Sequence, residues 1–293
     1  MAPRRSISAL LAAACLAGLL AAFPPPAGAA GGGKVNVLYA GSLTTVMTNR
    51  LGPAFQRATG ISVSGFAGGS QGLASQIKGG VVQGDVFISA SPAVNASLEG
   101  AANGNWVSWY ATFALSPLEL GYNPHSRFAS ALRRGPWYRV IAEPGIQVGR
   151  TDPAVDPKGV LTVDALTRAA RLHHEPALAR MARSTTNVFP EETLVGRLQA
   201  GQLDAGFFYS VEASAAGIPA IGLGKGFSYD AAYTVTVLRH APDPAAAVAF
   251  VSYLLSKPGE AILTRAGLTM TRVSVHGARS AVPRALRSRL LGR

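Results

Sequence analysis

The sequence predicts an α/β protein of two lobes, and three observations point to this class. Between residues 35 and 91, a buried-strand pattern, a loop of small residues and a helical pattern follow one another twice. After residue 145 the alternation of strand and helix patterns resumes. Between these regions, residues 109–122 form an apolar run that is too long for a strand of one compact sheet. We therefore expect this run to pass from one lobe to the other.

The first lobe is predicted to carry small-residue loops at the ends of its first two strands. The predicted strands are residues 35–40, 61–66 and 85–89, with helices through residues 43–55 and 73–77. Loops that follow parallel strands meet at one edge of a sheet, where ligands of open α/β sheets bind. Gly41 lets backbone N–H groups approach a ligand, and the hydroxyls of Ser42 and Ser70 add donors beside helix N-termini. These loops are interpreted either as a small-anion site or as ordinary helix N-caps made by the two serines.

The remaining elements complete two lobes with a ligand cleft between them. In the second lobe, strands are predicted at residues 145–149 and 205–209, with helices at 161–172, 177–183 and 191–200. A strand at 234–238 and helices from 245 and 256 then return to the first lobe. The predicted boundaries are a signal peptide at 1–30, lobe one at 31–115 and 231–275, lobe two at 116–230, and a basic tail at 276–293.

The N-terminus reads as an export signal. Arg4 and Arg5 precede an apolar run over residues 7–23, and small residues follow near a cleavage site at about residue 30. Cys15, the single cysteine, lies inside this signal, so the mature chain would have no thiol or disulfide. Attachment of a lipid to Cys15 is the alternative, although the Leu expected three residues earlier is absent. The expected location is periplasmic or otherwise extracytoplasmic, with membrane association left open.

The positive charge of the chain does not indicate nucleic-acid binding. The formal net charge is +12, and the last 22 residues contain six Arg and no acidic residue. Such a basic tail is typical of a solvated or disordered segment, which can touch an anionic membrane surface. The export signal and the lack of a basic face interleaved with aromatic residues exclude nucleic acid from the expected partners.

Lobe two contains polar residues at predicted helix starts and at a strand end. Asp156 lies in a turn with two Asp-Pro pairs, where a plain helix-start role is the alternative to ligand binding. Glu191 and Glu192 lie at another helix start, where a carboxylate is stabilised by the helix dipole. Tyr209 ends an apolar strand, so its hydroxyl faces either the cleft or a partner in the core.

No catalytic motif is evident, and we do not expect an enzyme or a cofactor. The surroundings of Ser42 and Ser70 are not a G-x-S-x-G elbow, and the five histidines show no triad order. The run from His173 to Glu175 lacks metal-ligand spacing and is interpreted as a solvated helix face. A secreted hydrolase with a Ser nucleophile is the alternative from a different class.

Several motifs resemble the molybdate/tungstate-binding proteins of ABC importers. They are Ala40-Gly41-Ser42-Leu43, the Gly-Ser loop at Ser70, residues 84–90, residues 149–159, residues 198–204 up to Tyr209, and residues 249–256. The resemblance covers nearly the whole mature chain. It implies a type II periplasmic-binding-protein fold, usually monomeric, that captures molybdate or tungstate and delivers it to membrane permease subunits. A carrier of sulfate or another oxyanion is the alternative within the binding class.

The resemblance also implies roles for individual residues. Serines at the positions of Ser42 and Ser70 donate hydrogen bonds to oxyanion oxygens. In one branch of the family two carboxylates coordinate the metal centre of the oxyanion, and Asp156 with Glu191 or Glu192 match them. In the other branch the position of the second carboxylate is occupied by an apolar residue that follows Asn. The pair Asn187-Val188 in this sequence resembles that pattern. Lys158, where the carboxylate branch often has Cys, and Ser210, where it often has Arg, depart from the pattern. The choice between tetrahedral and six-coordinate binding stays open.

Overall fold

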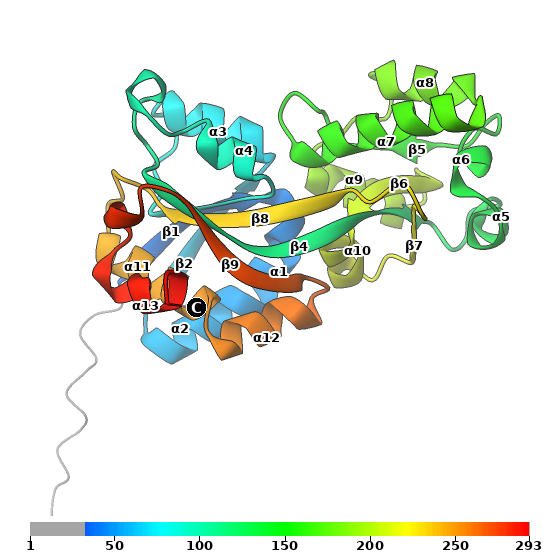
Figure 1. The fold of residues 1–293 in the computed structure, drawn as a ribbon. Helices are drawn as coiled ribbons and strands as arrows, with labels where there is room; N and C mark the ends of the chain where they lie inside the picture. The colour runs from blue at the N-terminus through cyan, green and yellow to red at the C-terminus, as the bar shows by residue number, and fades with distance from the viewer. Residues whose placement is uncertain (1–32, 293) are drawn as a thin grey trace, which may run out of the picture. The chain divides into compact units, whose positions relative to one another are not determined.

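The computed structural model describes residues 33–292. The predicted signal peptide and Cys15 lie outside these residues, so the predicted export signal stays a prediction. Nine strands connect in the order β2-β1-β3-β8-β4-β6-β5, with β7 and β9 also paired to β4. Mixed parallel and antiparallel pairing, with helices packed on the strands, confirms the predicted α/β class (Figure 1).

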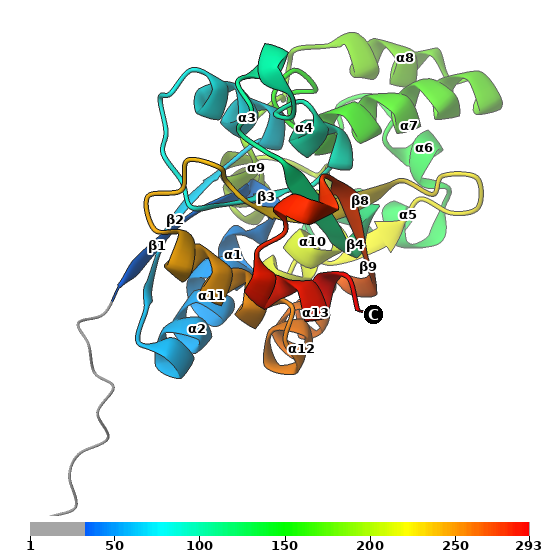
Figure 2. The same ribbon diagram turned by 60° about the vertical axis from the view of Figure 1, so that its left-hand side comes forward.

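The first part of the sheet is the predicted parallel unit. Its strands are β1 (Lys34–Ala40), β2 (Ser62–Gly68) and β3 (Val86–Ser89), and both β2 and β3 pair with β1 in parallel. Helices α3 (Ser70–Lys78) and α4 (Pro92–Ala96) lie on one face of these strands, and α2 (Gly52–Thr59) lies on the other (Figures 1 and 2). A short η3 (Ala101–Asn103) follows α4. Val37 and Leu38 of β1 point to opposite faces, and both are buried, because both faces of the strand are covered.

The first predicted helix is broken into four pieces. They are η1 (Gly41–Leu43), α1 (Thr44–Val46), the π-helical turn η2 (Met47–Leu51) and α2. Pro53 stands in the first turn of α2 and has no backbone N–H to continue an uninterrupted helix. The π-helical turn before it closes with the Gly52 N–H donating to the Met47 carbonyl, five residues back.

Strand β4 (Trp109–Tyr122) joins the two parts of the sheet, as the length of its apolar run predicts. Its first half pairs antiparallel with β8 (Asp230–Val237) and β9 (Thr269–Gly277), and its second half pairs with β6 (Ala205–Tyr209) and β7 (Ala220–Gly222). The register of both first-half pairings shifts between Thr112 and Ala114, which lets the strand bend there.

Helices surround the short second part of the sheet. Strand β5 covers Val148–Gly149, shorter than predicted, and pairs with β6 in parallel. The helices of this part are α5 (Ala129–Arg134), α6 (Trp137–Val140), α7 (Pro157–His173), α8 (Pro176–Arg183), α9 (Glu191–Gln199) and α10 (Ser210–Ala216). The buried strand β6 ends at Tyr209, where α10 begins. The predicted lobe boundaries at residues 115 and 230 stay predictions.

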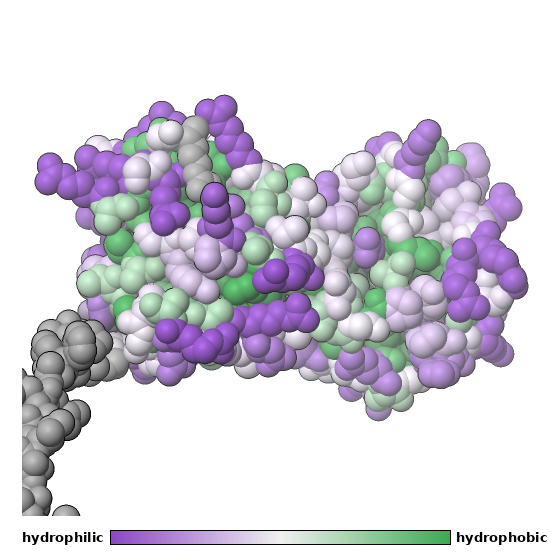
Figure 3. Space-filling view, turned by 90° about the horizontal axis from the view of Figure 1, so that it is seen from below, coloured by the Kyte–Doolittle hydropathy of each residue, from purple (hydrophilic) through white to green (hydrophobic). Residues whose placement is uncertain are grey.

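The C-terminal region, whose order the sequence left open, forms short helices after β9. After α11 (Pro244–Leu254), α12 (Lys257–Arg265) and β9, the chain forms η4 (Arg279–Ala281), η5 (Arg284–Leu286) and α13 (Arg287–Leu290). Val282, Leu286 and Leu290 recur every four residues and are buried in the main core. Burial of this apolar stripe orders the segment while its Arg side chains stay outside. Hydrophilic side chains cover much of the face seen in Figure 3.

Within residues 33–292, no single helix is long and apolar enough to cross a membrane. Helices α11 and α12 pass that test of length and composition only as a pair, and they are bent by 63° relative to each other.

Candidate functional site

The two small-residue loops of the first lobe lie at the same edge of the sheet. Ala40 at the end of β1 is in register with Gly68 at the end of β2, so Ser42 and Ser70 follow neighbouring strand ends. Both serines are buried. This arrangement is the one expected from parallel strands, whose carboxyl ends meet at one edge.

Neither serine acts as a side-chain N-cap, so the plain capping alternative does not describe them. The Ser42 hydroxyl lies 2.7 Å from the Tyr233 hydroxyl of β8. The Ser70 hydroxyl accepts a hydrogen bond of 3.1 Å from the Ala90 N–H. An accepting hydroxyl keeps its own hydrogen for a further acceptor, and Ser70 can therefore donate to a ligand.

Asp156 is both a helix cap and part of a buried charged cluster. As the N-cap of α7 it accepts a hydrogen bond of 2.8 Å from the Lys158 N–H. Burial raises the pKa of Asp156 to about 6, against the opposing charge of Lys158.

The Lys158 side chain is the centre of this cluster. Its Nζ lies 3.0 Å from Glu191 Oε1 and 2.5 Å from Glu212 Oε2, and the exposed fractions of the three side chains are 0%, 4% and 6%. Burial lowers the pKa of Lys158, but the charges of Glu191, Glu212 and Asp156 outweigh it and raise that pKa above its usual value. The ammonium is therefore charged at any ordinary pH.

The carboxylates around Lys158 outnumber the cations. Burial, followed by the charge of Asp156, raises the pKa of Glu191 to about 8. Burial also raises the pKa of Glu212 to about 7, against the opposing charge of Lys158. One ammonium cannot neutralise three buried carboxylates, so the cluster favours additional protons or a positive centre that the carboxylates can bind.

The structure separates the roles of the two adjacent glutamates. Glu191 is buried and faces Lys158, whereas Glu192 is exposed and accepts a hydrogen bond of 3.2 Å from Thr44. A Cβ on Gly41 would overlap the Glu191 carboxylate. Glu191 of α9 thus lies directly against the Gly41 loop, across the cleft between the two parts of the sheet.

Tyr209 lies fully buried beside the cluster, and its hydroxyl has no hydrogen-bond partner among the described residues. Its ring centroid is 5.8 Å from Lys158 Nζ and 6.3 Å from the ring of Tyr233. Burial raises the pKa of Tyr209 well above its usual value, so the hydroxyl remains a neutral donor. A buried hydroxyl without a partner is costly, and a ligand that accepts its hydrogen bond would remove that cost.

Two small cavities flank Glu191. One, of about 250 Å³, is lined by Gly69, Thr151, Asp156, Val188 and Glu191 among others. The other, of about 190 Å³, is lined by Gly41, Ser42, Glu191, Glu192 and Glu212 among others. Each cavity lies between a loop that follows β1 or β2 and a helix start in the second part of the sheet. Every residue predicted for the site, except Ser70 and Tyr209, lines one of the two cavities.

The cleft is closed beside these cavities. The Gly72 N–H donates a 3.1 Å hydrogen bond to the Val155 carbonyl, and a Cβ on Gly69 would overlap the same carbonyl oxygen. Glycine at position 69 therefore permits the approach of α3 to the loop before α7.

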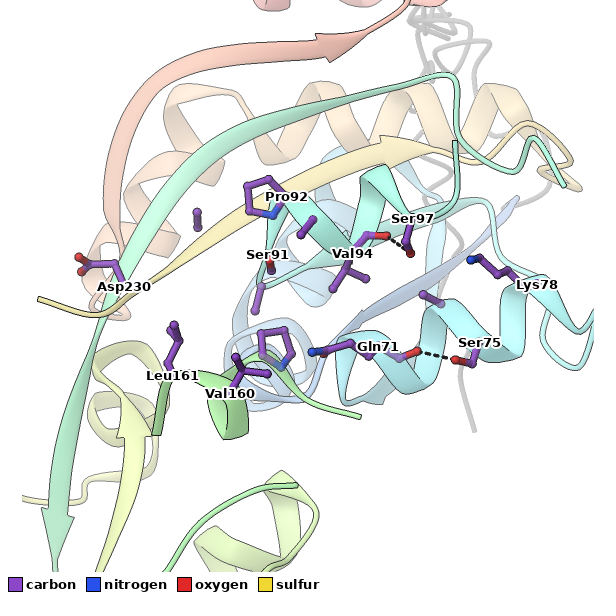
Figure 4. Close-up of a pocket in the computed structure, with 15 residues that line it drawn as sticks. Gln71, Ser75, Lys78, Ser91, Pro92, Val94, Ser97, Val160, Leu161 and Asp230 are labelled. Atoms are coloured by element: carbon purple, nitrogen blue, oxygen red, sulfur yellow. Dashed lines mark hydrogen bonds between the residues drawn. The ribbon is translucent and has the colours of Figure 1, made fainter. Parts of the chain in front are cut away.

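A third cavity, of about 400 Å³, opens between α3, α4 and the start of α7 (Figure 4). Gln71, Ser91, Val160 and Leu161 border it. It contains none of the predicted site residues, and its lining is mostly apolar.

The run from His173 to Glu175, interpreted as a solvated helix face, is only partly exposed. His174 is exposed, whereas His173 is half-buried and stacks on Tyr138 with ring centroids 3.5 Å apart. Within residues 33–292, no group of three or more His, Cys, Asp or Glu side chains is arranged to hold a metal ion.

Sequence reasoning did not select Glu212 and Tyr233, and it treated Lys158 as a departure from the family pattern. Glu212 lies in the first turn of α10, after the strand end at Tyr209, and Lys158 lies in the first turn of α7. Asp156 and Glu191 were selected because each is a polar residue at a helix start after a sheet-edge loop. The same criterion would have selected Glu212 and Lys158.

Known sequences similar to this chain are solute-binding proteins, several of them named for molybdenum or tungstate. The model of the bacterial extracellular solute-binding protein family matches residues 35–269. A Haloferax volcanii protein, named as a candidate molybdenum-binding protein of an ABC transporter, is 30% identical over 254 residues, which cover 86% of this chain and 76% of that protein. The molybdate/tungstate-binding protein WtpA of Pyrococcus abyssi is 24% identical over 209 residues, covering 54% of this chain and 61% of that protein.

Solved structures share the fold. The periplasmic molybdate-binding protein of Azotobacter vinelandii matches with a TM-score of 0.67 at 19% identity, covering 81% of this chain and 99% of that chain. The sulfate-binding protein SubI of Mycobacterium tuberculosis matches with a TM-score of 0.60 at 15% identity, covering 80% of this chain and 86% of that chain. Identities this low establish the fold and not the ligand.

The fold is the two-lobed α/β fold of the type II periplasmic binding proteins, as predicted. The chain belongs to the bacterial extracellular solute-binding protein family. The predicted resemblance to the molybdate/tungstate-binding proteins of ABC importers is confirmed.

Proposed function

We propose that this protein is exported and binds molybdate or tungstate in the cleft beside Lys158, without catalysing a reaction. The observation that carries the proposal is the convergence of buried polar groups from both lobes. Ser42 of the first lobe lines one cavity with Glu191 of the second, Asp156 lines the other cavity with Glu191, and Ser70 and Tyr209 are buried outside both cavities. Small-molecule sites of this fold class lie in such clefts at the carboxyl ends of strands.

The chemistry of the cluster fits an oxyanion with a metal centre. Hydroxyls of Ser42, Ser70 and Tyr209 donate to oxyanion oxygens, while the carboxylates of Asp156 and Glu191 coordinate the metal as added ligands. A buried carboxylate that faces a dianion without such a bond, or without a proton, would be strongly repelled. The site therefore selects against sulfate, whose central atom does not expand its coordination in this way.

Delivery to the membrane follows from closure of the lobes. The bound anion stabilises the closed form, and the closed form presents the surface that the permease subunits of an ABC transporter recognise. In energetic terms the ligand shifts the population toward closure by its differential affinity for the two forms.

A selection experiment tests the proposal. The purified protein is dialysed to equilibrium against an equimolar mixture of molybdate, tungstate, radiolabelled sulfate and phosphate, and the bound elements are measured. We expect about one bound molybdenum or tungsten atom per chain, as for a single site, and little bound radiolabelled sulfate. Bound sulfate or phosphate in excess of both metals would replace the proposal with a different oxyanion.

A further inference from the structure

The one buried cation of the cluster has no assigned role in oxyanion capture, although it touches two of the carboxylates there. Lys158 Nζ contacts Glu191 on α9 and Glu212 on α10, and the side chain is completely buried. Its ammonium lies 5.5 Å and 5.8 Å from the ring centroids of Phe208 and Tyr209. An ion with this degree of burial is retained only if its partners repay the cost of removing it from water.

We infer that Lys158, held in place by Glu212, is the counter-charge that allows Asp156 and Glu191 to lie against a dianionic ligand. The inference rests on the proposed function, because it concerns the charge of the bound oxyanion. Lys158 is then a specificity residue for dianions, and Glu212 is a positioning residue that acts through it.

The contacts of Lys158 leave room for this role. An ammonium has three N–H donors, and the contacts with Glu191 and Glu212 account for two of them. Lys158 lines neither cavity, so the third donor would reach an oxyanion oxygen once Glu191 turns to the ligand. When Glu191 turns to the ligand, Glu212 keeps the ammonium paired, so that the buried cation is not left without a partner.

Glu212 holds the lysine from the second cavity, which it lines together with Ser42 and Glu191. It lies in the first turn of α10, three residues after Tyr209, and its Oε2 atom accepts from Lys158 Nζ. The helix N-terminus stabilises its negative charge. Lys158 of α7 is thus held by carboxylates from two other helices, Glu191 of α9 and Glu212 of α10.

The charge of the ligand provides a readout that a merely structural lysine would not affect. Tungstate and perrhenate are both tetrahedral oxyanions of similar size, but the first carries two negative charges and the second carries one. Dissociation constants for both are measured by titration calorimetry on the purified protein and on Lys158→Met, which keeps length and apolar contacts. Lys225→Met, at an exposed lysine, is the matched control.

We expect the wild-type protein and Lys225→Met to prefer tungstate over perrhenate by about a hundredfold or more, and Lys158→Met to lose most of that preference. Equal losses for both anions, or an unchanged tungstate constant in Lys158→Met, would overturn the inference while the proposed function stands. No binding of tungstate or molybdate by the wild-type protein would instead overturn the proposed function and the inference together.

Two further variants keep the test decisive if Lys158→Met does not fold. Lys158→Arg keeps the charge and should keep the preference for tungstate. Glu212→Gln should weaken tungstate binding about tenfold or more, whereas Glu143→Gln, at an exposed glutamate, should leave it unchanged. Full affinity in Glu212→Gln, or loss of the dianion preference in a folded Lys158→Arg, would contradict the assigned roles.

Discussion

The hydroxyl groups of Ser42 and Tyr233 lie 2.7 Å apart, although the two residues are separated by 191 positions in the chain. This contact ties the loop after β1 to strand β8, one of the four strands that pair with β4. It also fixes the Ser42 hydroxyl at the cavity that Glu191 and Glu212 line. A ligand in that cavity would therefore meet an oriented hydroxyl.

Removing the Ser42 hydroxyl should weaken oxyanion binding. Ser42→Ala deletes one hydrogen bond to a charged ligand, a loss of about 1.5–3 kcal/mol, which corresponds to roughly ten- to a hundredfold in the dissociation constant. Calorimetric titration with tungstate measures it. Ser64→Ala, at an exposed position of β2, is the control and should bind normally. Equal affinity of the two variants would remove Ser42 from the site.

Tyr209→Phe should have opposite effects on stability and on binding. The Tyr209 hydroxyl is buried without a partner among the described residues, so its deletion removes a desolvation cost of about 1–3 kcal/mol from the ligand-free protein. The melting temperature without ligand should rise, and the affinity for the oxyanion should fall. A variant that melts lower and binds equally well would show that the hydroxyl has another partner and no role in capture.

The stability of the ligand-free protein should fall as the pH rises from weakly acidic to weakly basic. The pKa values of Asp156, Glu212 and Glu191 are raised to about 6, 7 and 8, so the folded protein holds these protons more tightly than the unfolded chain. The resulting stability is fully present below the ordinary carboxyl pKa of about 4 and is lost as the pH passes through the raised values.

Thermal melts between about pH 5 and 8.5 measure this decline. Glu191→Gln should flatten the curve, because it removes the carboxyl with the highest raised pKa of the three. A melting temperature that rises steadily across the same range would contradict the assignment of raised pKa values to the cluster.

Gly69→Ala should impair closure of the cleft more than it impairs folding. The added Cβ would overlap the Val155 carbonyl oxygen, a backbone atom that can yield only if α3 and the loop before α7 separate. We expect about tenfold weaker tungstate binding or more, with a larger radius of gyration by small-angle scattering. Gly222→Ala, where a Cβ meets nothing within 4 Å, is the control. Unchanged binding and radius would show that the ligand-bound form does not need this contact.

The sequence predicted those features that depend on local pattern. The apolar run of β4 defined a strand with the observed ends, and the Asp-Pro turn placed Asp156 at a helix start. Asp156 and Glu191 were both selected as helix-start carboxylates, and the structure brings both to Lys158. Helix starts and buried strands are encoded by nearby residues, which explains the agreement.

Features that depend on distant partners were not predictable. The pairing of Lys158 with Glu212 spans 54 positions, and nothing near Lys158 in the sequence indicates that its charge is buried. Strand β9 was missed because its exposed and half-buried residues do not alternate regularly. The C-terminal segment was read by its Arg content, while the burial of Leu286 and Leu290 depends on the core that they contact.

The most direct test of the central claim is titration calorimetry of the purified protein with molybdate, tungstate and sulfate, repeated with Asp156→Ala and Glu191→Ala. The account predicts tight binding of the two metal oxyanions, no heat with sulfate, and loss of binding in both carboxylate variants. Tight binding that survives both substitutions would contradict coordination by the carboxylates and leave capture to the hydroxyls of Ser42, Ser70 and Tyr209. No heat with any of the three anions would contradict the proposed function itself.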